Sequence, residues 1–227
     1  KRQVGADGIF SNTRSFFEKK KNEPKFKKAI AVRTILKTKS ELKIDEQRIS
    51  LMMGKNCHIV IYPLNQNKEL NLVCIIRDKK YDPDNIKTLV NKVVTQNSNL
   101  EKVFEGDLKS WPLYFTPKIL PSTNTKVFYI GDAFNGFLPT LAQGAGQSIE
   151  SAHELFNLIK DDKAEIQNTY FKERSRRAKI VKRRSNINFF AFHFSSSIMQ
   201  TLRNFFMKFL VKRKSFVNSY LGKVYKN

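Results

Sequence analysis

A glycine-rich stretch between an apolar run and a helical pattern is the feature that most limits how this chain can fold. Residues 129–156 read YIGDAFNGFLPTLAQGAGQSIESAHELF and hold four of the nine glycines in the 227-residue chain. The apolar residues before Gly131 predict a short strand that ends in Gly-Asp, and the pattern from Gly144 predicts a helix that ends near residue 160. A strand, a bare loop and a helix in this order are typical of an α/β sheet that binds a ligand at the carboxyl ends of its strands.

Two groups in this stretch can contact a ligand. The carboxylate of Asp132 follows the predicted strand, where it can accept hydrogen bonds from ribose hydroxyls. Gly144, Ala145 and Gly146 open the helix without bulky side chains, so their free N–H groups and the positive end of the helix dipole can approach an electron-rich atom. Pro139 stiffens the loop between the two groups because its ring fixes φ. An ordinary helix start with convenient glycines is the alternative interpretation.

The first residues and the middle of the chain carry strand patterns. Residues 4–17, VGADGIFSNTRSFF, read as the end of a strand, a glycine-rich turn and a short helix that starts at Ser11 or Asn12. Four apolar, β-branched runs predict an antiparallel sheet with one covered face, and the NQNK turn at residues 65–68 predicts a hairpin between the last two. These runs are residues 29–36, 48–54, 57–64 and 70–78.

Helical patterns follow the strands. Apolar residues between 86 and 94 recur with helical spacing behind Asp82 and Asp84, either of which can cap a helix, and we expect this helix to cover the sheet. Residues 164–185 show a basic helical pattern. Residues 187–211 hold seven phenylalanines interrupted by a histidine, an arginine and a lysine, and these charges argue against a membrane span.

The charge of the chain limits the classes of partner. Forty-two lysines and arginines against 20 acidic residues give a formal net charge of +22, so the surface attracts nucleic acid, acidic lipid or a phosphorylated cofactor. No RNA-binding, helix-turn-helix or zinc motif accompanies this charge, so we expect no nucleic acid partner. We expect the phenylalanine-rich residues to pack on the protein's own core or on a second copy in a homo-oligomer, with peripheral contact to an acidic membrane surface as the alternative.

Cysteine and histidine usage indicates neither a disulfide scaffold nor a metal site. Cys57 and Cys74 are expected to be buried thiols in a reducing compartment, which predicts a cytoplasmic protein, either free or peripheral at the inner membrane surface. The histidines at 58, 153 and 193 show no ligand spacing, so we expect no metal. His58 and Tyr62 are candidates for polar contact with a substrate, although both residue types are more often structural.

Two segments resemble motifs of a known enzyme family. GDAFNGFLPTLAQGAGQSIESA, residues 131–152, resembles the second flavin-binding motif of the class A flavoprotein monooxygenases, the p-hydroxybenzoate and salicylate hydroxylase family. GADGIFSNTR, residues 5–14, is similar to the Asp-Gly motif of that family, G-A-D-G-x-x-S-x-x-R. The two motifs stand in the family's order, about 125 residues apart. Between them, HIVIYPL at residues 58–64 is similar to the Tyr-Pro hairpin of the family's substrate domain.

The resemblance implies an FAD-dependent monooxygenase, an aromatic hydroxylase that uses NAD(P)H and O2 through a flavin C4a-hydroperoxide and acts on a small aromatic substrate. Asp132 would bind ribityl or ribose hydroxyls, Pro139 would line the flavin face, and the backbone of residues 144–146 would hold the N1–C2=O edge of the ring. The turn at residues 7–8 would lie near the pyrophosphate and the approach of the nicotinamide nucleotide, with Arg14 steadying that turn or contacting phosphate. The implied cofactor-binding residues are Asp7, Gly8, Arg14, Gly131, Asp132, Pro139, Gly144, Ala145 and Gly146.

The implied fold is mixed α/β, an FAD/NAD(P)-binding fold with an inserted antiparallel-sheet substrate domain and C-terminal helices. Residues 1–20 would end the FAD-binding domain with the Asp-Gly motif, and residues 21–118 would form the substrate-binding sheet. Residues 119–162 would return to the FAD-binding domain with the Gly-Asp motif, and residues 163–227 would form basic and amphipathic helices.

The sequence also departs from the family. No G-x-G-x-x-G unit precedes the Asp-Gly motif, so we expect a fragment that alone binds FAD weakly or not at all. Asn135 stands where the family usually has histidine, and Ser151 stands where an acidic residue often follows Glu150. Both differences weaken the assignment to a subfamily more than the assignment of the cofactor. A quinone-biosynthesis-type hydroxylase associated with the membrane surface and an inactive truncated flavoprotein are the alternatives.

Overall fold

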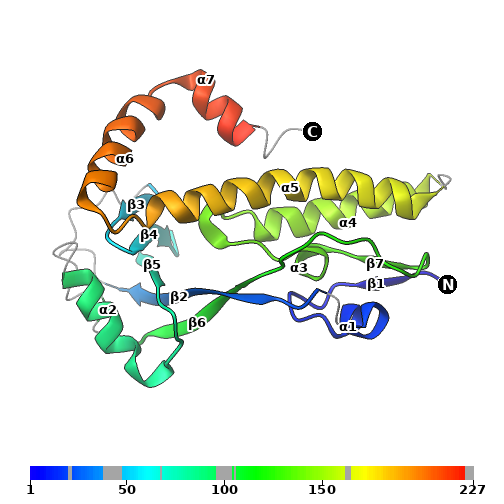
Figure 1. Ribbon diagram of the computed structural model, residues 1–227, viewed down its shortest axis with the longest axis horizontal. Helices are drawn as coiled ribbons and strands as arrows, with labels where there is room; N and C mark the ends of the chain where they lie inside the picture. The colour runs from blue at the N-terminus through cyan, green and yellow to red at the C-terminus, as the bar shows by residue number, and fades with distance from the viewer. Residues whose placement is uncertain are drawn as a thin grey trace. The chain divides into compact units, whose positions relative to one another are not determined.

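The computed structural model describes residues 1–19, 22–37, 48–66, 68–95, 104, 106–161 and 165–222 (Figure 1). The chain divides into two units, each assembled from segments that are far apart in the sequence. Unit 1 comprises Lys1–Phe26, Tyr114–Phe189 and Ser215–Asn227, and unit 2 comprises Lys27–Leu113 and Phe190–Lys214. The functions assigned above to individual segments stay predictions.

Unit 1 contains a two-stranded parallel sheet. β1 (Gln3–Gly5) pairs with β7 (Val127–Tyr129), so the residues before the Asp-Gly turn lie beside the strand that leads into the glycine-rich stretch. Parallel pairing brings the carboxyl ends of both strands to one edge. The strand prediction is wrong in one detail: Gly131 and Asp132 lie in a one-turn helix, α3 (Gly131–Phe134), because Gly131 has a φ of +56°, which ends the extended backbone.

The remaining elements of unit 1 are helical. The helix predicted from Gly144 is confirmed as α4 (Gly144–Lys160). The basic helix predicted for residues 164–185 is longer, because no glycine or proline interrupts the chain before it ends at Phe192. The helical elements are α1 (Asn12–Glu18), α3, η3 (Pro139–Leu141), α4, most of α5 (Ile166–Phe192), α7 (Lys214–Val217) and η4 (Asn218–Gly222).

Strand β7 organises the core of unit 1. Because successive side chains of a strand point to opposite faces, Phe128 belongs to one apolar cluster, and Val127 and Tyr129 belong to another. The Phe128 cluster contains Leu155, Leu158, Ile166 and Tyr170, and the second cluster contains Ala133, Phe134 and Ala178. Both clusters include residues of α5, so this helix holds both faces of the short strand.

Unit 2 is built on a five-stranded sheet in the order β3-β4-β5-β2-β6. β4 pairs antiparallel with β3 and β5, and β5 pairs antiparallel with β2. The predicted antiparallel sheet and the β4–β5 hairpin are therefore confirmed; Asn67 of the turn lies outside the described residues. The strands are β2 (Lys25–Leu36), β3 (Ser50–Met53), β4 (Cys57–Leu64), β5 (Glu69–Arg77) and β6 (Lys109–Phe115).

One face of this sheet is covered by a helix, as predicted. Asp82 caps η1 (Pro83–Asn85), which leads directly into α2 (Ile86–Thr95). Ile86, Val90 and Val94 of α2 pack against alternate residues of β4, β5 and β2, including Cys57 and Cys74. Both cysteines are buried thiols, as predicted. The last element of unit 2 is α6 (Ser197–Leu210), and the mixed α/β class is confirmed.

A buried arginine joins α4 and α5, which lie side by side in Figure 1. The side chain of Arg174 is 2 % exposed, and its Nη1 lies 2.9 Å from Glu154 Oε1 and 3.4 Å from Glu150 Oε2. Its Nη2 donates to the side-chain oxygen of Gln147 at 2.9 Å. A buried charge is tolerated only when it is paired in this way.

We therefore expect Arg174→Gln to lower the free energy of unfolding by about 3 kcal/mol, because it leaves two carboxylates without their buried partner. Urea unfolding of the purified chain followed by circular dichroism measures this change. Arg176→Gln is the matched control, since Arg176 is exposed on the same helix, and it should change stability by less than about 0.5 kcal/mol. Equal effects of the two substitutions would contradict the assignment.

Candidate functional site

The buried side chain of Arg14 connects the Asp-Gly turn with the glycine-rich stretch. Its Nη1 donates to the carbonyl oxygens of Ala133 at 2.7 Å and Phe134 at 2.6 Å, and its Nη2 donates to that of Leu120 at 3.2 Å. The guanidinium also lies 5.1 Å from the centre of the Tyr129 ring, a cation–π contact. Arg14 is only 8 % exposed. The two motifs identified in the sequence are thus joined directly, through carbonyl groups of α3.

The Asp-Gly turn itself is closed by Asp7. One carboxylate oxygen of Asp7 accepts from the Ser11 hydroxyl, and the other accepts from the backbone N–H of Thr13 at 2.9 Å. Burial would raise the pKa of Asp7, but the hydrogen bonds from Ser11 and Thr13 outweigh it and lower the pKa. Ser11 also caps α1 by accepting from Arg14 N at 2.9 Å, as predicted, and Gly8 permits the turn with a φ of +81°.

Glu18, at the end of α1, is a second buried anchor. It accepts from the Tyr129 hydroxyl at 2.9 Å, the Ser122 hydroxyl at 3.0 Å and the Thr123 N–H at 3.1 Å. Burial would raise the pKa of Glu18, but these donors hold it below its ordinary value. Burial, followed by the Glu18 hydrogen bond, raises the pKa of Tyr129 to about 12. Glu18 and Arg14 therefore hold β7 and the chain before it against α1.

Two glycines of the stretch are required for packing. A Cβ on Gly136 would lie 2.3 Å from Cδ1 of Ile9, so the loop can approach the Asp-Gly turn only without a side chain there. A Cβ on Gly131 would lie 2.6 Å from the Ser148 hydroxyl, and the Gly131 N–H donates to Ser151 Oγ at 2.9 Å. These contacts hold α3 against α4.

The glycines that open α4 lie in a different environment. A Cβ on Gly144 would meet no atom within 4 Å, and one on Gly146 would meet only the side-chain oxygen of Gln143, at 3.8 Å. The side chain of the N-cap residue, Gln143, makes no capping hydrogen bond, so within the described ranges the first N–H groups of α4 have no capping acceptor. Pro139 begins η3 and is exposed, like Ala145. The start of α4 thus offers open N–H donors.

The carboxylate of Asp132 provides an acceptor on the neighbouring helix α3. Asp132 is half-buried, and this burial raises its pKa. In the part of the chain that the structure describes, no hydrogen-bond donor contacts it. FAD offers the complementary groups, namely ribityl and ribose hydroxyls as donors and the N1–C2=O edge as an acceptor. The residues present therefore fit this cofactor.

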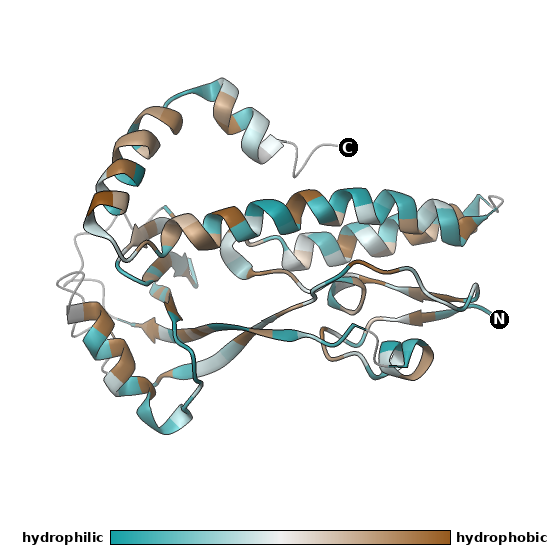
Figure 2. Ribbon diagram, viewed as in Figure 1, coloured by the Kyte–Doolittle hydropathy of each residue, from teal (hydrophilic) through white to brown (hydrophobic). Residues whose placement is uncertain are grey.

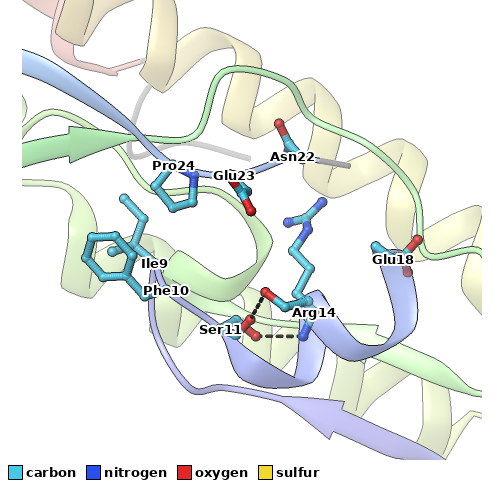
Figure 3. A pocket seen from close by; sticks show the side chains of 9 residues that line it. Ile9, Phe10, Ser11, Arg14, Glu18, Asn22, Glu23 and Pro24 are labelled. Atoms are coloured by element: carbon cyan, nitrogen blue, oxygen red, sulfur yellow. Dashed lines mark hydrogen bonds between the residues drawn. The ribbon is translucent and has the colours of Figure 1, made fainter. Parts of the chain in front are cut away.

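A pocket of about 310 Å³ lies beside the Asp-Gly turn. Figure 3 shows Ile9, Phe10 and Pro24 along one side of it and the Arg14 side chain on another. The Nε of Arg14 is buried and has no hydrogen-bond partner among the residues that the structure describes. Since the Nη groups bind carbonyls, Arg14 steadies the adjacent backbone; approach of a nicotinamide nucleotide at this turn stays a prediction.

The two substrate-contact candidates lie on β4 in unit 2. His58 is buried, with its Nδ1 3.0 Å from Nε2 of His193, so two of the histidines lie together although the sequence indicated no cluster. Burial and, secondarily, His193 lower the pKa of His58 to about 3. Tyr62 is half-buried on the same face of the sheet. Sequence analysis did not single out Arg33 and Asn71 beside it, although polar residues within apolar strand runs are a usable signal.

The described ranges hold neither a metal-binding cluster nor a helix able to cross a membrane. No group of three or more histidine, cysteine, aspartate or glutamate side chains there is arranged to hold a metal ion. No helix in those ranges has the length and apolar character needed to cross a bilayer.

Comparisons with known proteins extend this description. Residues 2–223 match the family model described as squalene epoxidase. Salicylate hydroxylase from Pseudomonas putida is 26% identical over 192 residues, which cover 73% of this chain and 44% of that protein. A 3-amino-4-hydroxybenzoate 2-monooxygenase from Streptomyces platensis is 24% identical over 218 residues, 88% of this chain and 53% of that protein. The chain thus spans about half the length of the curated relatives it matches.

A solved structure shares the fold. Klebsiella pneumoniae HpxO complexed with FAD and uric acid superposes with a TM-score of 0.81 at 12% identity, covering 97% of this chain and 59% of that one. The predicted fold, part of an FAD-binding fold with an antiparallel sheet, is therefore confirmed.

The Glu18–Tyr129 contact should make stability depend on pH at both ends of the scale. Because the pKa of Glu18 is lowered, its contribution is present above the ordinary value of 4.5 and is lost as the pH falls through the folded-state pKa. Because the pKa of Tyr129 is raised, its contribution is complete below pH 10.0 and is lost as the pH rises to about 12.

Tyr129→Phe should lower the free energy of unfolding at neutral pH by about 1–2 kcal/mol, since it removes a hydrogen bond to a charged group. It should also reduce the loss of stability between pH 10.0 and about 12. Urea unfolding at a series of pH values measures both effects, with Tyr114→Phe as the control for loss of a hydroxyl elsewhere in unit 1. An unchanged alkaline slope in Tyr129→Phe would refute the assignment.

Proposed function

The chain belongs to the squalene epoxidase family, and from this membership we propose that it forms part of an FAD-dependent monooxygenase. The resemblance to the salicylate hydroxylase group that the two motifs predicted is confirmed by the relatives, which are hydroxylases and monooxygenases. One observation carries the proposal for this chain. The carboxylate of Asp132, which no hydrogen-bond donor among the described residues contacts, lies on α3. This helix packs against Ser148 and Ser151 of α4, whose glycine-lined start is uncapped by its N-cap residue.

We propose that these groups hold the flavin half of FAD. Asp132 accepts hydrogen bonds from ribityl or ribose hydroxyls, and the first N–H groups of α4, at residues 144–146, donate to the ring edge. The positive end of the α4 dipole favours negative charge at that edge. Pro139, exposed in the loop between them, lines the flavin face. Bound FAD would supply the redox chemistry, namely acceptance of a hydride from NAD(P)H and reduction of O2, with one oxygen atom entering an aromatic substrate and the other leaving as water.

Arg14 acts as a positioning residue in this proposal. Its guanidinium is engaged by three carbonyl oxygens, two of them in α3, so it fixes the helix that carries Asp132. Asp7 and Gly8 shape the turn from which Arg14 extends. A nicotinamide nucleotide would approach beside this turn, where the pocket lined by Ile9 and Phe10 opens.

The proposal predicts saturable binding of FAD to the purified chain, measured by quenching of flavin fluorescence over a wide FAD concentration range. Asp132→Ala should weaken this binding about tenfold or more, because it removes a charge-assisted hydrogen bond. Asp107→Ala, at an exposed aspartate of unit 2, should leave it unchanged.

Gly144→Val gives an independent arm of this test. A Cβ at this position meets no atom within 4 Å, so this variant should fold normally and still lose FAD affinity because it covers the helix start. An FAD affinity that neither Asp132→Ala nor Gly144→Val lowers would reject the proposed flavin site.

We also propose that α6 rests on an acidic membrane surface. Arg203 is 7 % exposed on one side of the helix, where it donates to the carbonyl oxygens of Ala191 and Met53. The opposite side exposes a stripe of apolar residues, which recur along α6 in Figure 2. These are Ile198, Leu202, Phe205, Phe206 and Phe209.

The basic residues next to this apolar stripe favour anionic lipid as its partner. Lys208 lies on α6, and Lys212, Arg213 and Lys214 follow it directly, so the phenylalanines are flanked by cations. Exposed aromatic residues next to lysine and arginine are typical of helices that lie in the interface of anionic lipid.

Pelleting with liposomes that contain phosphatidylglycerol should recover the chain at low salt, and less of it at high salt, because salt screens the attraction to lipid. Phe205→Ser combined with Phe209→Ser should abolish recovery. Phe16→Ser, at an exposed phenylalanine of α1, should have no effect. Failure of the chain to pellet with these liposomes at low salt would reject the membrane proposal. A stable dimer that the α6 substitutions dissociate would reject it in favour of self-association through α6.

A further inference from the structure

Thr140 joins the loop that carries Pro139 to helix α5. The Thr140 hydroxyl donates to the carbonyl oxygen of Ser185 at 2.7 Å, and the Thr140 carbonyl oxygen accepts from Nδ2 of Asn188 at 3.2 Å. Ser185 and Asn188 are three residues apart in α5, so they lie on the same side of the helix. These two hydrogen bonds fix η3 beside α5, and with it the residue that the flavin proposal places against the ring.

The C-terminal segment contacts the same asparagine. The Tyr220 hydroxyl, in η4, donates to Oδ1 of Asn188 at 2.7 Å. Burial raises the pKa of Tyr220 against an opposing effect of Arg184, so the hydroxyl keeps its proton at neutral pH. Asn188 thus connects two parts of unit 1 that are far apart in the sequence, the C-terminal segment and η3.

The contact with Tyr220 determines which way the Asn188 amide faces. A side-chain amide has an acceptor oxygen on one side and a donor nitrogen on the other, and only the nitrogen can bind a carbonyl oxygen. With Tyr220 donating to Oδ1, Nδ2 faces the carbonyl oxygen of Thr140. A reversed amide would place two oxygens against each other. The Tyr220 hydroxyl therefore favours the orientation that holds η3.

Arg184 holds Tyr220 in place. Its Nη1 donates to the carbonyl oxygen of Tyr220, and its Nη2 donates to that of Ser219 at 3.1 Å. The guanidinium also lies 5.0 Å from the centre of the Tyr220 ring, on which the Phe216 ring stacks. Arg184 and Asn188 are four residues apart, about 6 Å along the helix axis, so one tyrosine can contact both. The backbone, ring and hydroxyl of Tyr220 are thus all docked on α5.

We propose that Tyr220 is a positioning residue for the flavin site and acts through Asn188 on the loop that presents Pro139. This inference rests on the proposed function, because the loop has this role only if the flavin lies against it. It gives residues 216–220 a part in the affinity for FAD without any contact with the cofactor. When this segment leaves α5, the Asn188 amide loses its fixed orientation and η3 loses a hydrogen bond.

The first test is hydrogen–deuterium exchange of the purified chain without FAD, measured by mass spectrometry on the peptide that covers residues 137–143. Tyr220→Phe removes the hydroxyl and keeps the ring, so exchange in this peptide should become about fivefold faster, the factor that corresponds to one lost hydrogen bond. Peptides of β4 and β5 should exchange at unchanged rates. Tyr81→Phe is the matched control, since it removes a hydroxyl that donates to the carbonyl oxygen of Ser110 in unit 2. It should leave the exchange of residues 137–143 unchanged.

The second test measures FAD affinity by quenching of flavin fluorescence. Tyr220→Phe should weaken FAD binding about fivefold. Arg184→Gln should also weaken it, because this substitution releases the segment that carries Tyr220. Arg183→Gln, at an exposed neighbour on α5, is the matched control and should leave the affinity unchanged.

A double variant separates a positioning role from a general effect on stability. If Tyr220 acts through Asn188, adding Tyr220→Phe to Asn188→Leu should cause no further loss of FAD affinity and no further rise in the exchange of residues 137–143. Additive effects of the two substitutions would overturn the inference. An unchanged exchange rate in Tyr220→Phe would overturn it as well.

The positioning inference and the flavin proposal fail in different ways. If Asp132→Ala and Gly144→Val lower FAD affinity while Tyr220→Phe changes neither that affinity nor the exchange of residues 137–143, only the positioning inference is rejected. If Tyr220→Phe speeds this exchange but none of the three substitutions lowers FAD affinity, the flavin proposal is rejected, and the control of the loop by Tyr220 is supported.

Discussion

The capture of three backbone carbonyl groups by Arg14 is the interaction on which the candidate site depends. Each carbonyl belongs to a segment more than 100 residues from Arg14, and two of them end the helix that carries Asp132. A buried guanidinium requires acceptors for its donors, so α3 is held in place by the same contacts that satisfy the arginine. The turn closed by Asp7 and the cap from Ser11 in turn set the direction from which Arg14 enters. The position of Asp132, the proposed acceptor for the flavin hydroxyls, therefore depends on residues to which the proposal assigns no contact with the flavin.

Periodicity and the two motifs predicted much of this arrangement. The strands of unit 2, the hairpin between β4 and β5, the helix over the sheet and the start of α4 all follow local patterns, because each is set by alternation, capping or turn chemistry. The extension of α5 to Phe192 and the short α3 were not predicted. The first depended on where a helix stops without a glycine or proline, and the second on the positive φ of Gly131.

The different roles of the four glycines in residues 129–156 could be assigned only from the structure. The sequence shows four similar glycines, but Gly131 and Gly136 are crowded by Ser148 and Ile9, whereas Gly144 faces open space. That difference depends on contacts between distant segments, which local patterns do not contain. For the same reason Arg33 and Asn71 were overlooked: only the strand register places them together, and only burial shows that one amide donor has no acceptor. The motif resemblance implied ligand contacts for three of the four, Gly131, Gly144 and Gly146, without separating the crowded Gly131 from the open Gly144.

The contact between His58 and His193 has a consequence for local motion. The last turn of a helix ordinarily frays, because its carbonyl groups lack partners and its side chains are exposed. Here His193, the residue that follows α5, is buried against His58 near the start of β4, and its Nε2 also lies 3.3 Å from the carbonyl oxygen of Ile75. Fraying at Phe192 would expose the two buried imidazoles of His58 and His193 and a strand carbonyl together. The end of α5 is thereby part of the cooperative unit of the sheet, and its amide hydrogens should exchange with solvent at the rate of β4 and β5 rather than at that of a free helix terminus.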